Sequence, residues 1–160
     1  MSPSWDLVLI IFFAISILYG FLLRERVVVT LLGIYAAILV TEYWGEAIYQ
    51  FLAKSPVAGG QDSLSVFTVQ IVLLIAVLLI ISLKGGVLIH PASIGRVLIA
   101  HLVMALYGFF SAALIASAVM RFLPPNISEM LVTNSSLARV VASYTTWWLI
   151  LPIGLMLILN

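Results

Sequence analysis

The sequence predicts an all-α membrane protein, folded as one bundle of four to five transmembrane helices. Hydrophobic residues make up 64% of the 160 residues and charged residues 8%, whereas a soluble domain carries about 25% charged residues. The mean hydropathy is +1.28. Segments of about 20 apolar residues span the ~30 Å hydrocarbon core of a bilayer as helices. Five apolar segments contain no Asp, Glu, Lys or Arg, and they cover residues 7–23, 27–40, 66–83, 97–120 and 147–159.

The first two helices are expected over 5–23 and 27–51, within a single transmembrane domain that covers residues 1–160. Trp5 is an interfacial anchor for the first helix. Asp6 is the only charge near its start, so a basic n-region is missing, and the helix is expected to be retained rather than cleaved as a signal peptide. The second helix ends in mixed aromatic and polar residues, which are typical of the membrane interface.

The third helix is expected over 65–83, where the run Lys84-Gly85-Gly86 stops it. The short, half-apolar stretch 87–96 contains Pro91, which suits a first helical turn. We therefore expect a short interfacial helix there, leading into the fourth transmembrane helix over 97–120.

The last helix is expected over 140–159. Two prolines force a turn at 124–125, and a polar stretch follows as far as 136. Pro152 interrupts the apolar part of the last helix, which a buried membrane helix tolerates. This helix either crosses the membrane fully or enters obliquely and lies partly in the interface.

Orientation follows from the Lys and Arg residues of the short loops, because such residues are enriched on the cytoplasmic side. Arg24 and Arg26 flank the corner between the first two helices closely. We therefore expect this corner in the cytoplasm, beside the lipid headgroups, with the N-terminus outside. The two sides hold four and three basic residues: Arg24, Arg26, Lys84 and Arg96 against Lys54, Arg121 and Arg139.

Glu42 and Glu46 are four residues apart, so both carboxylates lie on one face of the second helix. An acid inside a membrane is costly unless it is used, so the pair is a candidate cation or proton site. Glu42 lies about 24 Å along the helix from Arg26, near the far headgroup region, and this depth favours ordinary interfacial residues over a functional acid pair. His101, near the start of the fourth helix, is a candidate proton site or a hydrogen-bonding partner of a neighbouring helix.

Small residues recur every four positions on three of the helices. Such ridges let helix backbones approach closely in a membrane, either within one chain or between copies. Polar residues inside the spans are few, and a water-filled path through one copy would need more: Ser16, Thr30, Thr68, Gln70 and Ser111. The ridges contain Ser16 and Gly20, then Gly33 and Ala37, then Gly108, Ala112 and Ala116.

The N-terminal third resembles the CvpA family, the small bacterial inner-membrane proteins named for colicin V production. The resemblance is carried by Trp5-Asp6, Gly20-Phe21, Arg24-Glu25, Leu32-Gly33 and Ala36-Ala37. The second half is compatible with it, through Gly95-Arg96-Val97-Leu98, Gly108, the Ser-rich stretch 134–137 and Trp147-Trp148. The family has no established catalytic residues, so the resemblance implies none here. It implies a bacterial inner-membrane location and a link to toxin production or export and to envelope upkeep.

The sequence thus favours a non-enzymatic role that works through helix-mediated assembly with itself or with other membrane proteins. Two alternatives stay open: a small oligomeric channel or holin-like pore, and a structural subunit of a larger membrane complex. The net charge of +1 argues against a nucleic-acid partner. The chain has no cysteine, which excludes thiolate catalysis and Cys-ligated metal, and no motif predicts a cofactor or metal site.

Overall fold

The computed structural model describes residues 4–23, 27–54, 65–84 and 97–159. It confirms the all-α fold class, because every regular element in the described residues is a helix. The elements are α1 (Trp5–Leu23), α2 (Val27–Ala53), α3 (Val66–Lys84), α4 (Val97–Phe122), α5 (Pro125–Asn134), α6 (Ser136–Ser143) and α7 (Thr145–Leu159).

Four of the described helices, α1 to α4, are long and apolar enough to cross a membrane. Together α6 and α7 form a fifth candidate span, broken by a bend of 66°. The apolar side chains on the outside of these helices fit contact with lipid chains, and the chain is a multi-pass membrane protein.

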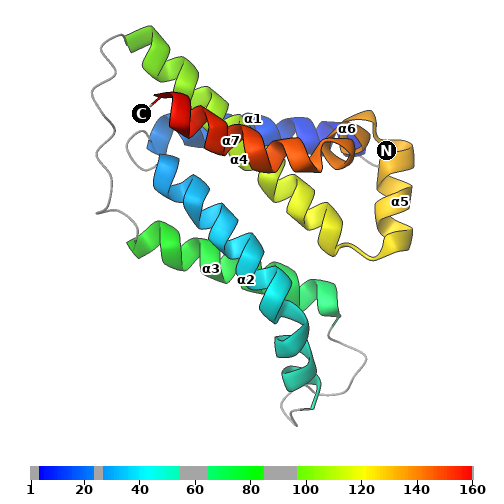
Figure 1. Cartoon of the computed structure of the whole chain (residues 1–160). Coiled ribbons are helices and arrows are strands. Elements are labelled where there is room, and N and C mark those ends of the chain that lie inside the picture. The colour runs from blue at the N-terminus through cyan, green and yellow to red at the C-terminus, as the bar shows by residue number, and fades with distance from the viewer. Residues whose placement is uncertain (1–3, 24–26, 55–64, 85–96, 160) are drawn as a thin grey trace.

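Helix α4 is the central element of the bundle, as Figure 1 shows. Helices α1 and α7 pack on one part of α4, and the antiparallel pair formed by α2 and α3 packs on another. The main core lies between α2, α3 and α4, around the fully buried side chains of Leu31, Ile34 and Leu114. A hydrogen bond of 2.6 Å from the Tyr35 hydroxyl to the Leu149 carbonyl ties α2 to α7.

Helices α1 and α4 cross backbone to backbone at two glycines. A Cβ atom on Gly20 would lie 2.8 Å from the Met104 carbonyl oxygen, and one on Gly108 would lie 2.7 Å from the Ser16 carbonyl oxygen. These contacts are with main-chain atoms, which cannot turn aside. The small-residue spacing of α1 and α4 is therefore used inside the chain at this crossing, where only glycine fits.

The α2–α3 pair uses a second ridge of small residues. A Cβ atom on Gly33 would lie 2.8 Å from Cγ2 of Ile81, and one on Gly45 would lie 2.7 Å from Cγ of Gln70. Ala37 and Thr41, which lie between the two glycines at the same spacing of four, are fully buried. The ridge that the sequence shows at Gly33 and Ala37 thus continues for two more turns.

Replacing Thr41 by valine is expected to stabilise the protein by about 1 kcal/mol, because a buried hydroxyl without a partner costs free energy. The Thr41 side chain is fully buried, and its Oγ1 finds no hydrogen-bond partner among the described residues. Valine keeps the shape and removes the hydroxyl. Ser117→Ala is the control, since the buried Ser117 hydroxyl already donates to the Leu114 carbonyl at 2.9 Å. Equal or lower stability of Thr41→Val in a detergent unfolding titration would contradict the expectation.

The C-terminal quarter differs from the sequence-based prediction. The polar stretch expected after the two prolines contains the helix α5, with Pro125 in its first turn. The single helix expected over 140–159 is broken at Tyr144, between α6 and α7. Side chains satisfy the carbonyls freed at the break: the Thr145 hydroxyl donates to Ala142 at 2.9 Å and the Trp148 indole to Val141 at 3.0 Å. Ser135 separates the two short helices: α5 ends at Asn134 and α6 begins at Ser136.

Other expectations concern residues outside the described part of the chain. They are the short interfacial helix over 87–96 and the basic residues Arg24, Arg26 and Arg96. Lys84 is the last residue of α3. The orientation of the chain in the membrane stays a prediction.

Candidate binding cavity between four helices

A cavity of about 280 Å³ lies where α1, α2, α3 and α4 meet. It exists because α1 packs on α4 and the α2–α3 pair packs on α4, which leaves space between α1 and the pair. The Gly20–Gly108 crossing forms part of its wall. Each of the four transmembrane helices contributes side chains to the lining.

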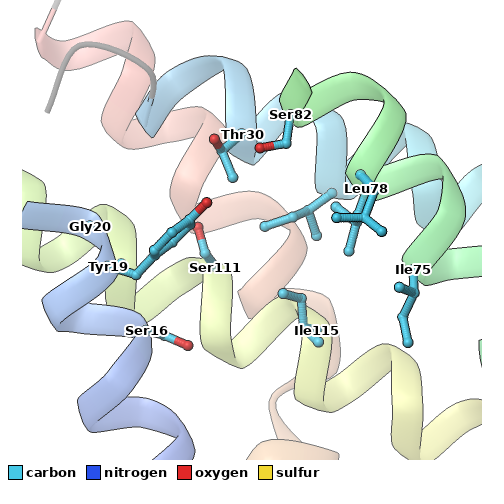
Figure 2. A pocket seen from close by; sticks show the side chains of 12 residues that line it. Ser16, Tyr19, Gly20, Thr30, Ile75, Leu78, Ser82, Ser111 and Ile115 are labelled. Atoms are coloured by element: carbon cyan, nitrogen blue, oxygen red, sulfur yellow. The ribbon is translucent and has the colours of Figure 1, made fainter. Parts of the chain in front are cut away.

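Five hydroxyl groups line this cavity. Figure 2 shows the hydroxyls of Tyr19, Thr30, Ser82 and Ser111 toward one end of the cavity. Ser16 lies lower on α1 in the same lining. Among the described residues, none of these five hydroxyls has a hydrogen-bond partner. They are therefore available to a molecule that enters the cavity.

The other end of the cavity is apolar, with Ile75 and Leu78 from α3 and Ile115 from α4 (Figure 2). Two side chains of the lining, Tyr19 and Ile75, are about half exposed, at 48% and 51%. The cavity is partly open to the outside of the bundle, which in a membrane is lipid. The described residues of the lining include no charged group, so the cavity combines hydroxyls with an apolar wall.

The candidate ion site at Glu42 and Glu46 lies elsewhere. Glu42 forms an ion pair with Arg121 at the end of α4, and both side chains are partly exposed. Glu46, one turn further along α2, is exposed. The pairing gives Glu42 a structural contact between α2 and α4. The ion site at Glu42 and Glu46 stays a prediction.

His101 is not brought near the two acids. It lies at the start of α4, where its ring is 6.1 Å from that of Phe21 on α1. Arg121, the partner of Glu42, is 20 residues further along α4, which is about 30 Å along the helix axis. The three residues therefore do not form one proton path within this chain.

Asp6 has a role that the sequence pattern did not indicate. Its carboxylate accepts hydrogen bonds from the Ser135 hydroxyl at 2.5 Å and from the Leu137 backbone N–H at 3.1 Å. The Ser136 hydroxyl is a third donor, at 3.4 Å. Ser135 also caps α6 by accepting from the Ala138 N–H at 3.0 Å. A carboxylate is favourable at a helix N-terminus, so Asp6 fastens the start of α1 to the start of α6.

We expect Asp6→Ala to loosen α6 while leaving the α2–α3 pair intact, because the three donors at the start of α6 lose their acceptor. Hydrogen–deuterium exchange of the amides over 135–143 should become faster in this variant. In Asp6→Asn, the exchange rate over 135–143 should lie between that of Asp6→Ala and that of the original chain, since the asparagine amide oxygen still accepts hydrogen bonds. Glu46→Gln is the control for a lost acid, and exchange over 135–143 that stays unchanged in Asp6→Ala would refute the role.

Several residues of the site are missed by reasoning from the sequence alone. Tyr19 counts as an aromatic residue of an apolar span, and Ser82 lies close to a helix end. Outside the cavity, in the α2–α3 ridge, Thr41 and Gly45 continue the spacing of four from Gly33, but they fall among the aromatic and polar residues that indicate the interface. That spacing was the signal that could have identified them.

Comparison with protein families, with curated proteins and with solved structures gives no match.

Proposed function

We propose that this chain is a non-enzymatic, ligand-binding protein of the bacterial inner membrane that takes up an amphiphilic membrane component between its helices. The observation that carries the proposal is the partly open cavity. At one end it has hydroxyls without a hydrogen-bond partner among the described residues, and at the other it has aliphatic side chains. Binding sites in bundles lie between helices and combine an apolar lining with a few polar groups.

The polar end of the cavity makes occupation favourable. Hydroxyl groups that leave water without gaining hydrogen bonds cost free energy, and lipid chains offer them no partner. A ligand with a polar end satisfies several hydroxyls at once, while its apolar part contacts Ile75, Leu78 and Ile115. An entirely apolar molecule would leave the hydroxyls without partners.

The biological setting that we propose is the one implied by the CvpA resemblance, namely support of toxin production or export, or of envelope upkeep. Four positions that carry the resemblance support it through their structural roles. Gly20 and Gly108 form the α1–α4 crossing, Gly33 packs on α3, and Asp6 caps α6. All four positions contribute to helix packing or capping.

We also propose assembly with a second copy or with other membrane proteins. Ala112 and Ala116 on the α4 ridge are buried within the chain, so a partner would use another surface. The outward face of α1 supports this role, because it presents an apolar stripe of exposed residues: Leu7, Ile11, Ile15, Leu18 and Leu22. Light scattering in nanodiscs, with lipid mass subtracted, measures how many copies assemble. If the protein is a monomer, self-assembly is excluded and only assembly with other membrane proteins is left.

Ligand binding is tested with photoactivatable lipid probes that carry the reactive group near the end of the acyl chain. The intact protein in nanodiscs is expected to be labelled on the cavity-lining peptides of α1, α3 and α4. Ser111→Phe fills the cavity and should abolish that labelling. Leu102→Phe adds bulk to the exposed, lipid-facing side of the same helix and should not. Equal labelling of the two variants, or none of the cavity peptides in the intact protein, would overturn the proposal.

A further inference from the structure

We infer that the ligand is an uncharged acylglycerol, bound with its glycerol end among the hydroxyls of Tyr19, Thr30, Ser82 and Ser111 and an acyl chain against the aliphatic wall. The inference rests on the proposed function and deepens it, since it names the chemical class of the ligand. Three features of the cavity support it: its charge, its hydrogen-bonding groups and its depth in the membrane.

The lining favours an uncharged ligand. All the described residues that line the cavity are neutral: none is an aspartate, glutamate, lysine, arginine or histidine. Removing a charged headgroup from water into such surroundings is unfavourable unless an opposite charge is present. A neutral end that carries hydroxyl and ester oxygens avoids this cost.

The hydrogen-bonding groups match glycerol and its esters. Each serine, threonine or tyrosine hydroxyl both donates and accepts, and the cavity holds five of them without partners in the described residues. A glycerol hydroxyl donates and accepts in the same way, and ester carbonyls accept. Both kinds of group on one ligand can therefore be satisfied by neighbouring hydroxyls of the protein.

Two of the hydroxyls, those of Thr30 and Ser82, lie at a depth that matches the glycerol level of one leaflet. Thr30 lies three residues after the start of α2 and Ser82 two residues before the end of α3, so both are within about 5 Å of the helix ends along the axis. Ile75, nine residues before the end of α3, is about 14 Å deep. The polar end of the cavity thus lies near the membrane interface and its apolar end in the hydrocarbon core, which is the orientation of a lipid in that leaflet.

The test compares two photoactivatable probes with identical acyl chains, a diacylglycerol and a phosphatidylglycerol, in nanodiscs of phosphatidylcholine. At equal probe content, the diacylglycerol is expected to label the cavity peptides at least fivefold more strongly. The full chain is used, and each variant is first checked for the helicity and particle mass of the original protein.

A variant that lacks three of the five cavity hydroxyls but keeps the shape of the cavity tests the recognition itself. Tyr19→Phe, Thr30→Val and Ser111→Ala in one chain should reduce diacylglycerol labelling at least fivefold. The control is Tyr43→Phe with Thr133→Val, which removes one tyrosine and one threonine hydroxyl from exposed positions on α2 and α5. Labelling in the control is expected to equal that of the original chain.

The outcomes separate the two proposals. Stronger or equal labelling by phosphatidylglycerol, or full diacylglycerol labelling of the variant that lacks hydroxyls, would overturn the inference about the ligand class but leave a ligand-binding cavity. Absence of label from the cavity peptides with both probes would overturn the proposed function as well.

Discussion

Replacing Gly108 by alanine is expected to destabilise the bundle by about 2 kcal/mol, the usual effect of forcing extra atoms into a packed site. The added Cβ would lie 2.7 Å from the Ser16 carbonyl oxygen and 2.9 Å from Cα of Ile17. Both atoms belong to the main chain of α1, so the helices must move apart for the methyl group to fit. Their separation would loosen contacts along the whole α1–α4 crossing.

Gly154→Ala is the matched control for this prediction, because a Cβ at Gly154 in α7 meets nothing within 4 Å. Its stability in a detergent unfolding titration should stay within about 0.5 kcal/mol of the original chain. Gly20 and Gly108 touch each other across the crossing, so the double alanine variant should be less destabilised than the sum of the two single variants. A Gly108→Ala variant as stable as Gly154→Ala would show that α1 and α4 do not cross here.

Replacing Leu114 by alanine is expected to destabilise the protein by about 2 kcal/mol, at the lower end of the range for buried leucine. Leu114 is fully buried in the core between α2, α3 and α4. In a water-soluble protein, such a change loses both the free energy of transferring the side chain out of water and its packing contacts. In a membrane the lipid chains are as apolar as leucine, so the loss of packing and the remaining cavity account for the effect.

Leu102→Ala provides the comparison on the same helix. The Leu102 side chain is 62% exposed and faces lipid, so its truncation should change the stability by less than about 0.5 kcal/mol. Thermal unfolding of both variants in nanodiscs measures the difference. If Leu102→Ala lost as much stability as Leu114→Ala, the outward side of α4 would be packed against protein rather than lipid.

The all-α membrane fold could be predicted because its cause lies in each segment by itself. A segment such as 66–83 has no charged residue, and in lipid its backbone groups must be paired within the segment, which only a helix achieves without a partner. The same reasoning failed for residues 125–159. There, Ser135 and Tyr144 divide the segment into three helices. The distant Asp6 accepts hydrogen bonds at the first break, and the side chains of Thr145 and Trp148 donate to freed carbonyls at the second.

The candidate site was predicted only in part. Ser16, Thr30 and Ser111 stand out in the sequence as polar residues inside spans, but nothing in their spacing says that they meet. They meet because α1 crosses α4 at glycine and the α2–α3 pair packs on another part of α4. Glu42 was a candidate ion site by its spacing from Glu46, whereas its partner Arg121 is 79 residues away in the chain.

Sequence alone therefore determined that this chain is a multi-pass helical membrane protein with small-residue ridges, because hydropathy, helix length and four-residue spacing are local properties. Only the tertiary structure decided which ridges pair, that Asp6 caps α6, and that hydroxyls from four helices line one cavity. The physical reason is that lipid supplies no hydrophobic force to select helix partners. Selection depends on the fit of surfaces such as the Gly20–Gly108 crossing, and that fit is a property of two helices together.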